Sequence, residues 1–291
     1  MTDKTFFLGL GGQKCGSSWM QAYLARQPGS DFGRLGEYQI WESDLGGPFG
    51  RYKVATPSTA QKLKGESKRR LGLAMPADYL RWRLQTDRSL YFEYFAGLLD
   101  KPGIRRTGDV TPSYGALPAP ILAGIRDGFA ERGITVKVLF SMRDPVARLA
   151  SHLRMDQSKG YTTASGDFAA DLQAFYPGQE AAARTRYDLT LAAIAQVFAP
   201  SDVHICLFET LFTPKGTAAF ADFSGVATDT DAGQTPVNAG RSAARDVPEP
   251  LEAEIARHYA PVYHAARTAL PQSADLWASA RHLNPEPKAA P

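Results

Sequence analysis

The sequence predicts an α/β fold with three layers, in which helices cover both faces of a mainly parallel central sheet. Three short apolar runs have the character of buried strands, and they lie far apart in the chain, at residues 6–10, 135–139 and 203–208. Stretches with helical spacing lie between and after them. Strands that alternate with helices produce parallel sheets, whose ligands bind at the carboxyl ends of the strands.

The first strand leads directly into a glycine turn. Residues 6–10 end at Gly11 and Gly12, and residues 17–26 then have the spacing of a helix, which the Pro-Gly pair at 28–29 closes. The predicted order is strand, glycine loop, helix.

A second unit has the same order. Apolar and polar side chains alternate around residues 135–139, and the chain turns at Arg143, Asp144 and Pro145. Asp144 is a typical N-cap and Pro145 a typical first helical residue, so we expect a helix over about 146–155. Further helices are expected at 118–132, 188–198 and 250–270.

The length of 291 residues and the hydrophobic content of 44% suit one large domain. We expect this domain to span 1–283, with insertions near 51–88 and 155–186, and the tail 284–291 to be disordered. The first insertion is rich in Lys and Arg. Such a run is usually a solvated face, and the alternative is a lid that contacts an anionic acceptor.

Composition excludes several classes of function. The 33 basic and 30 acidic side chains are too evenly balanced for nucleic-acid binding by bulk charge. Cys15 and Cys206 belong to no zinc-binding cluster, so we expect reduced thiols and no metal. The first residues lack the long apolar stretch of a signal peptide, and no uncharged run approaches a membrane span, so we expect a cytoplasmic protein.

The strongest functional signal is the loop at residues 11–19, Gly-Gly-Gln-Lys-Cys-Gly-Ser-Ser-Trp. A glycine turn at a helix N-terminus aims backbone N–H groups at one point and binds phosphate. Lys14 adds a full charge, and Ser17 and Ser18 add hydroxyl donors. The order differs from a Walker A loop, which ends in Gly-Lys-Ser or Gly-Lys-Thr. A glycine turn with a surface lysine is the alternative.

The second signal lies at residues 140–152. Arg143 leaves the end of a strand, and Ser151 lies about two turns into the following helix, so an arginine fork and a hydroxyl can hold one dianion. Arg-Asp-Pro alone is common at ordinary strand-to-helix corners. Two such anion sites on two strands are much rarer by chance.

Both motifs resemble those of sulfotransferases that use 3'-phosphoadenosine 5'-phosphosulfate (PAPS). The first is similar to their 5'-phosphosulfate loop, and the second matches their 3'-phosphate motif, Arg-Asp-Pro, two residues, Arg, two residues, Ser. The resemblance implies a fold like that of P-loop nucleotide hydrolases, with adenosine 3',5'-bisphosphate as the product. It assigns donor binding to Gln13, Lys14, Cys15, Gly16, Ser17, Ser18, Trp19, Arg143, Ser151 and Arg241.

Two weaker segments extend the resemblance. Residues 108–114 are similar to the segment that lines the acceptor cleft of bacterial and heparan-type sulfotransferases, although Val110 replaces a frequent lysine; a simple turn is the alternative. It implies that Thr111, Ser113 and Tyr114 bind the acceptor. Residues 237–241 resemble the late loop that closes over the nucleotide, which is the basis for assigning Arg241.

All 5 histidines lie at or after His152, so the segment nearest the first phosphate loop contains none. The general base there is therefore expected to be a carboxylate. Residues 36–41 resemble the Lys-Glu-x-x-Phe-Phe segment that supplies a catalytic glutamate in heparan-type members, and Glu37 is the match. Lys14 and Glu37 are therefore the predicted catalytic residues, with Glu42 and Asp44 as nearby rivals.

The sequence thus predicts a sulfotransferase that moves a sulfuryl group from PAPS to a hydroxyl or amine of a carbohydrate or small molecule. One alternative is a P-loop-type kinase of a small molecule, which would need magnesium and ATP. Another is a catalytically silent nucleotide-binding protein. Neither the acceptor nor the oligomeric state follows from the sequence.

Overall fold

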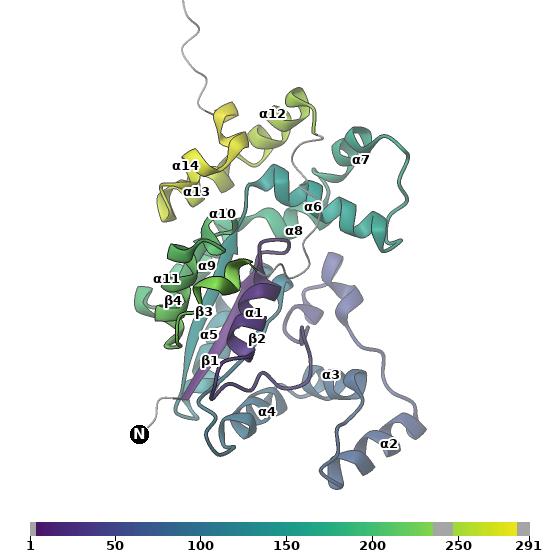
Figure 1. Ribbon diagram of the computed structural model, residues 1–291. Coiled ribbons are helices and arrows are strands. Elements are labelled where there is room, and N and C mark those ends of the chain that lie inside the picture. Colours follow the sequence, from purple (N-terminus) through teal and green to yellow (C-terminus); the bar gives the residue numbers. More distant parts are fainter. Residues whose placement is uncertain (1–3, 235–246, 284–291) are drawn as a thin grey trace, which may run out of the picture.

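The computed structural model describes residues 4–234 and 247–283. Its centre is a sheet of four parallel strands in the order β2-β1-β3-β4, with helices on both faces (Figure 1). The predicted three-layer α/β/α fold is confirmed. The strands are β1 (Lys4–Gly11), β2 (Arg106–Val110), β3 (Ile134–Met142) and β4 (Val203–Leu207). The predicted tail 284–291 and the segment 237–241, with Arg241, lie outside the described residues.

The helices follow the strands in the order expected for crossover connections. They are α1 (Ser17–Ala25), α2 (Thr59–Arg70), α3 (Ala77–Thr86), α4 (Ser89–Leu99), α5 (Ala119–Ala130), α6 (Pro145–Ser158), α7 (Phe168–Phe175), α8 (Gln179–Thr185), α9 (Tyr187–Val197), α10 (Phe208–Leu211), α11 (Pro214–Ser224), α12 (Glu249–His258), α13 (Ala260–Ala269) and α14 (Ser273–Leu276). Short 3₁₀ turns include η1 (Glu42–Asp44), η2 (Gly47–Tyr52) and η3 (Pro112–Ala116).

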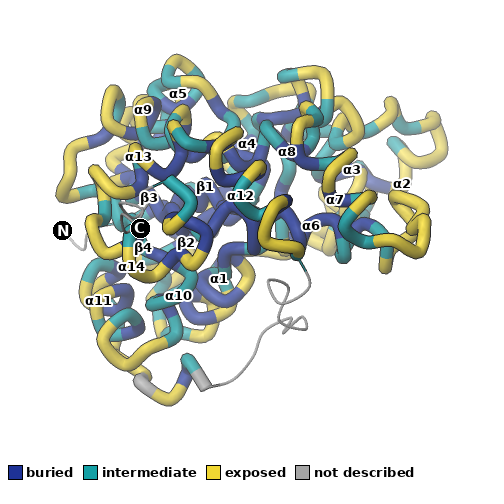
Figure 2. Tube along the Cα trace, turned by 90° about the horizontal axis from the view of Figure 1, so that it is seen from above, coloured by how far each residue is buried: buried dark blue, intermediate teal, exposed yellow. Residues whose placement is uncertain are grey.

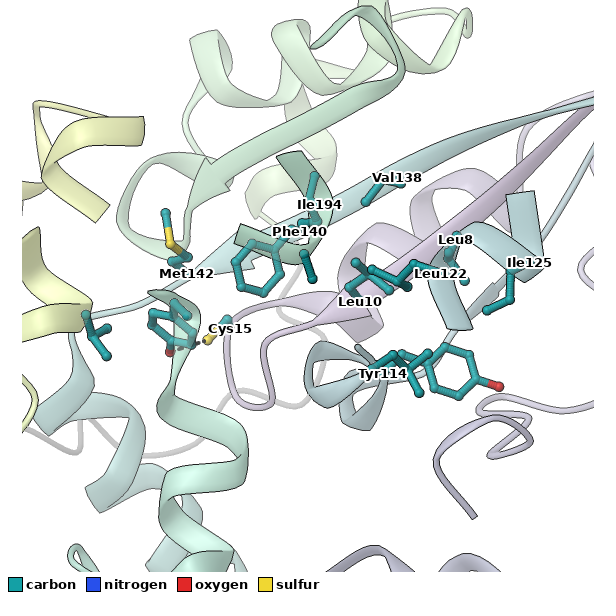
Figure 3. Close-up of a cluster of buried hydrophobic side chains, with 14 of the residues drawn as sticks. Leu8, Leu10, Cys15, Tyr114, Leu122, Ile125, Val138, Phe140, Met142 and Ile194 are labelled. Carbon is teal, nitrogen blue, oxygen red and sulfur yellow. Dashed lines mark hydrogen bonds between the residues drawn. The ribbon is translucent and has the colours of Figure 1, made fainter. Parts of the chain in front are cut away.

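Alternate residues of β1 pack into two cores, one on each face of the sheet. Phe6 and Leu8 join the larger core with α4, α5 and α9, while Phe7 packs with α1 and α11. Figure 3 shows part of the larger core, where Leu8 and Leu10 of β1 meet Val138 and Phe140 of β3. The buried sheet with its two helical layers is visible from above in Figure 2.

Strand β2 was not predicted, because its sequence, Arg-Thr-Gly-Asp-Val, has only one large apolar residue. Pairing with β1 defines it, with Leu8 opposite Asp109. Gly108 is needed here, because a Cβ at this position would lie 2.5 Å from the carbonyl oxygen of Phe7. β2 carries the residues after it to the same edge of the sheet as the glycine loop.

The prediction of one continuous helix at 250–270 is wrong. The chain forms α12 and α13 instead, with Tyr259 between them and Pro261 in the first turn of α13. Proline lacks an N–H and its ring clashes with the preceding turn, so a helix breaks there. Of the two segments predicted to be insertions, 51–88 contains α2 and α3, and 155–186 contains α7 and α8.

Within the described ranges, the structure contains no helix with the length and apolar character needed to cross a membrane.

Candidate functional site

The glycine loop between β1 and α1 is fixed by the end of β3. The Gly12 N–H donates to the Ser141 carbonyl oxygen at 2.7 Å, and the Ser141 hydroxyl donates to the Cys15 carbonyl oxygen at 2.6 Å. On the other side, the Cys15 sulfur lies 3.4 Å from the Tyr187 hydroxyl, shown as the dashed line at Cys15 in Figure 3. Gly16 has φ +92, and a Cβ there would lie 2.7 Å from Leu211. The loop therefore has one tightly packed conformation.

Some backbone N–H groups of this loop are available to a ligand. Among the described residues, none accepts a hydrogen bond from the N–H of Lys14, Gly16, Ser17 or Ser18. The N–H groups at the two ends of the stretch from Cys15 to Trp19 are already engaged. Cys15 donates to Gly12 and Trp19 donates to Gly16, at 3.1 and 3.0 Å. The free donors at the start of α1 still form an anion-binding helix terminus.

Trp19 is part of the core. Its side chain is only 3% exposed, its indole N–H donates to the Ala232 carbonyl oxygen at 3.0 Å, and its ring packs against Tyr23 and Phe212. Of the two serines that precede Trp19, Ser18 is exposed and Ser17 is buried. Trp19 therefore holds α1 against the segment around Ala232.

Lys14 lies at the tip of the loop, half-buried and with φ 67. The pKa of its ammonium is lowered, first by burial and then by the positive charges of Arg143 and Lys159. Partial dehydration and neighbouring cations both disfavour the lone ammonium, and both are relieved when an anion binds. Lys14 is therefore prepared for an anionic ligand.

Arg143 meets the loop at the carboxyl end of β3. Its Nη1 donates to the Lys14 carbonyl oxygen at 3.3 Å, and its guanidinium lies 4.3 Å from the centre of the Phe208 ring. The predicted N-cap that follows is confirmed, because the Asp144 carboxylate accepts from the Val146 N–H at 2.9 Å. The two predicted anion motifs thus lie together at one edge of the sheet. Ser151 is half-buried in the second turn of α6.

Arg148, the second arginine of this motif, is completely buried behind the loop. Its Nη1 lies 3.5 Å from both the Gln13 amide oxygen and the His152 Nδ1. Sequence reasoning gave no role to Arg148, nor to Ser141 and Tyr187, which also hold the loop. Apart from the Arg148–His152 pair within α6, their contacts join segments far apart in the chain, which no local pattern indicates.

His152 belongs to a charged cluster with Asp156 and Glu180, whose possible metal-ligand atoms all lie within 4.8 Å of one another. Glu180 accepts hydrogen bonds from Arg51 and Arg184 at 2.8 and 2.6 Å. We therefore interpret Glu180 as part of an ion-pair network with Arg51 and Arg184, next to which His152 and Asp156 lie. His152 is fully buried, and burial lowers its pKa to about 4, so it stays neutral and out of reach of a substrate.

Glu37 and its two rivals differ sharply in their surroundings. Glu37 is half-buried, and burial raises its pKa although Lys159, Arg81 and Arg184 oppose the rise. Glu42 is fully buried and bound by the Ser113 hydroxyl at 2.5 Å, and its pKa is raised by burial to about 7. Asp44 is exposed and paired with Arg88 and Lys53. Glu42 is thus buried, and Asp44 is paired with two cations. Glu37 is partly accessible, and no arginine or lysine among the described residues pairs with its carboxylate.

The segment from Tyr38 to Ile40 is held by a buried network around Asp109. The Thr111 and Tyr114 hydroxyls donate to the Asp109 carboxylate at 2.6 and 2.7 Å. The same hydroxyls accept from the N–H groups of Tyr38 and Ile40 at 3.1 and 3.0 Å. Thr111 and Tyr114, together with Ser113 on Glu42, therefore position the Glu37 segment. Their contact with an acceptor stays a prediction.

Comparison with solved structures identifies the fold. No family model and no curated protein matches the sequence. A crystal structure of a sulfotransferase from Alicyclobacillus acidocaldarius matches with a TM-score of 0.57 and 18% identity, over 92% of this chain and 96% of that one. The sulfotransferase domain from the Synechococcus PCC 7002 olefin synthase gives a TM-score of 0.49 and 15% identity, over 92% and 95% of the two chains. The protein has the sulfotransferase fold that its two anion-binding motifs predict.

Proposed function

We propose that this protein is a sulfotransferase that transfers a sulfuryl group from PAPS to a hydroxyl or amine of a carbohydrate or small-molecule acceptor. The hydrogen bond from Arg143 to the Lys14 carbonyl is the observation on which this proposal rests. It joins two anion-binding motifs at the carboxyl edge of a parallel sheet, where ligands of such folds bind. A nucleotide with phosphate at both ends of its ribose suits this pair.

The loop side of the site would hold the 5'-phosphosulfate. The free N–H groups at the start of α1 and the hydroxyls of Ser17 and Ser18 offer donors to the 5'-phosphate. Lys14 would contact the bridging oxygen, where its charge offsets the negative charge that develops as the S–O bond breaks. This interaction strengthens in the transition state, so it accelerates the reaction.

The Arg143 side would hold the 3'-phosphate, which distinguishes PAPS from ATP. Arg143 keeps its guanidinium in place through the Phe208 ring and the Lys14 carbonyl. Ser151 and Arg241 are the other proposed contacts. A guanidinium fork binds a phosphate dianion with two hydrogen bonds, so the pair adds affinity and orientation together.

Glu37 would act as the general base. The acceptor oxygen or nitrogen forms a bond to sulfur as the bond from sulfur to the 5'-phosphate oxygen breaks, and Glu37 takes the proton that the acceptor loses. Its raised pKa makes it a stronger base than an ordinary glutamate. The burial of His152 and Glu42 supports this assignment.

The test is mass spectrometry of a broad acceptor library incubated with the full chain and PAPS. A product heavier by one sulfuryl unit, together with adenosine 3',5'-bisphosphate, is the expected result. Lys4→Ala is the matched control for Lys14→Ala. Lys4 begins the strand that leads to the glycine loop, so it lies at the end of β1 that is far from Lys14.

Two parallel incubations separate the alternatives. Magnesium-dependent phosphorylation from ATP, without sulfation from PAPS, would identify a kinase. Tight binding of adenosine 3',5'-bisphosphate without any sulfated product would identify a silent nucleotide-binding protein.

A further inference from the structure

The outer face of α2 presents leucines to solvent. Leu63 lies in α2, Leu71 is the residue that caps its C-terminus, and Leu73 lies just beyond. The eight-residue spacing places Leu63 and Leu71 within about a quarter turn of each other around the helix axis. The exposed fractions of the three leucines are 66%, 72% and 58%. Five large apolar side chains are at least 58% exposed in the described part of the chain, and the 11 residues from Leu63 to Leu73 contain three of them. Such a density on one helix is unusual for a surface without a partner.

Helix α2 is held from one side only. Gly65 faces α3, where a Cβ would overlap the Tyr79 ring, and the Lys62 ammonium lies 5.0 Å from the centre of the Trp82 ring. Figures 1 and 2 both place α2 at the outer edge of the molecule beside α3. The side that bears Leu63 and Leu71 faces away from this contact.

Positive charge surrounds the leucines. Residues 51–88 contain 10 of the 33 basic side chains but only 3 of the 30 acidic ones, so the rest of the chain is more acidic than basic. Lys64 and Lys68 form a row next to Leu63 and Leu71 at the i, i+4 spacing. Glu66 is the only acid of α2, and its carboxylate accepts a hydrogen bond from the Arg69 guanidinium at 2.9 Å.

We propose that the outer face of α2, defined as Leu63, Lys64, Lys68, Leu71 and Leu73, docks the protein on the surface of an anionic lipid bilayer. Leucines on a basic helix enter the boundary between headgroups and acyl chains while the lysines meet the anionic headgroups. This inference is independent of the proposed sulfotransferase activity.

Charge and area favour a bilayer over other partners. A soluble polyanion would engage the lysines but would leave the three leucines in water. A protein partner needs about 800 Å² on each side. The 12 residues of α2 provide a face only about 18 Å long and about 10 Å wide. A bilayer needs no shape complementarity, so a single projecting helix is sufficient.

The experiment is co-sedimentation of the full chain with vesicles of phosphatidylcholine alone and with vesicles that also contain phosphatidylserine. We expect binding to the anionic vesicles at low salt, weakening as salt is added because the headgroup charges are screened. Equal binding to both vesicles, or no binding to either, overturns the proposal.

Two variants separate the contributions. Leu63→Ser/Leu71→Ser/Leu73→Ser and Lys64→Gln/Lys68→Gln should each lower the bound fraction at limiting lipid by about tenfold. Leu189→Ser, on α9, removes a leucine that is also 58% exposed and should change nothing.

If the leucine variant binds like the unmodified protein while heparin competes with the vesicles, the helix is a polyanion site and the bilayer proposal is wrong. An equal loss in Leu189→Ser also contradicts it. All substituted side chains are on the surface, and thermal unfolding by circular dichroism checks that each variant folds.

Discussion

The guanidinium of Arg143 donates a hydrogen bond to the carbonyl oxygen of Lys14 at 3.3 Å. These residues are far apart in the chain, and each follows the carboxyl end of one of two adjacent parallel strands. The contact uses the backbone of Lys14, so the ammonium remains available to a ligand. Two cationic side chains are in this way brought to one place.

Lys14→Ala should lower the turnover number by about 100-fold or more, because it removes the charge that stabilises the leaving phosphate. Steady-state sulfation measured by mass spectrometry checks this. Lys4→Ala should retain normal turnover, since its exposed ion pair with Asp100 contributes little. Near-normal activity of Lys14→Ala would rule out its assigned role.

Arg143→Ala should weaken binding of adenosine 3',5'-bisphosphate by about 10- to 100-fold, which is the cost of losing a charged hydrogen bond. Adenosine 5'-phosphate lacks the 3'-phosphate, so its affinity should change little. Calorimetric titration with both nucleotides makes the comparison. Arg132→Ala is the control, because Arg132 also covers a phenylalanine ring but lies near the opposite end of β3. Equal losses for both nucleotides would mean that Arg143 only supports the loop.

Glu37→Gln should abolish sulfation and leave the affinity for adenosine 3',5'-bisphosphate nearly intact, because an amide cannot accept the proton at neutral pH. Rates and calorimetry on the same preparation check both parts. Asp44→Asn changes a neighbouring exposed carboxylate and should keep full activity. Retained activity in Glu37→Gln, or its loss in Asp44→Asn, transfers the role to another group.

The pH profile of kcat/KM should be bell-shaped, with both limbs moved toward neutrality. Glu37 must be ionised, and its pKa lies above the ordinary 4.5, so activity falls at a higher pH than for an exposed glutamate as acid is added. Lys14 must be protonated, and its pKa lies below the ordinary 10.5, so activity falls earlier as the pH rises. A profile flat from acid to alkaline pH contradicts both assignments.

Glu42→Gln should stabilise the fold at alkaline pH. Burial raises the Glu42 pKa to about 7, whereas the unfolded chain has the ordinary 4.5, so the native state binds the proton more tightly. Stability is therefore lost as the pH rises between these values. The variant has no charge to bury and should gain up to about 3 kcal/mol in the free energy of unfolding at pH 8, but little near pH 4. Urea unfolding at both pH values is the measurement, and an unchanged pH dependence argues against it.

The glycine loop and the Arg143 corner could be predicted because their signals are local. A buried run before Gly11-Gly12 indicates a strand and a tight turn, and Asp144-Pro145 indicates the start of a helix. The edge at which both meet follows from parallel pairing alone. These three inferences placed Lys14 and Arg143 together without any tertiary information.

The rest depends on contacts that no local pattern encodes. β2 is a strand because β1 pairs with it, and its Asp109 is tolerated inside the protein because the hydroxyls of Tyr91, Thr111 and Tyr114 bind its carboxylate. The burial of Arg148 against Gln13 is likewise set by α6 packing behind the loop. Spacing in the sequence indicates which residues share an element, but it does not indicate which buried groups find partners.

The Asp109 network ties the Glu37 segment to the end of β2. The hydroxyls that accept from the N–H groups of Tyr38 and Ile40 belong to residues that follow β2, whereas Lys14 and Arg143 follow the ends of β1 and β3. The proposed base and the proposed nucleotide contacts are thus positioned by different strands. We expect substitutions near Tyr38 and Thr111 to change which acceptor reacts, while the affinity for the nucleotide stays the same.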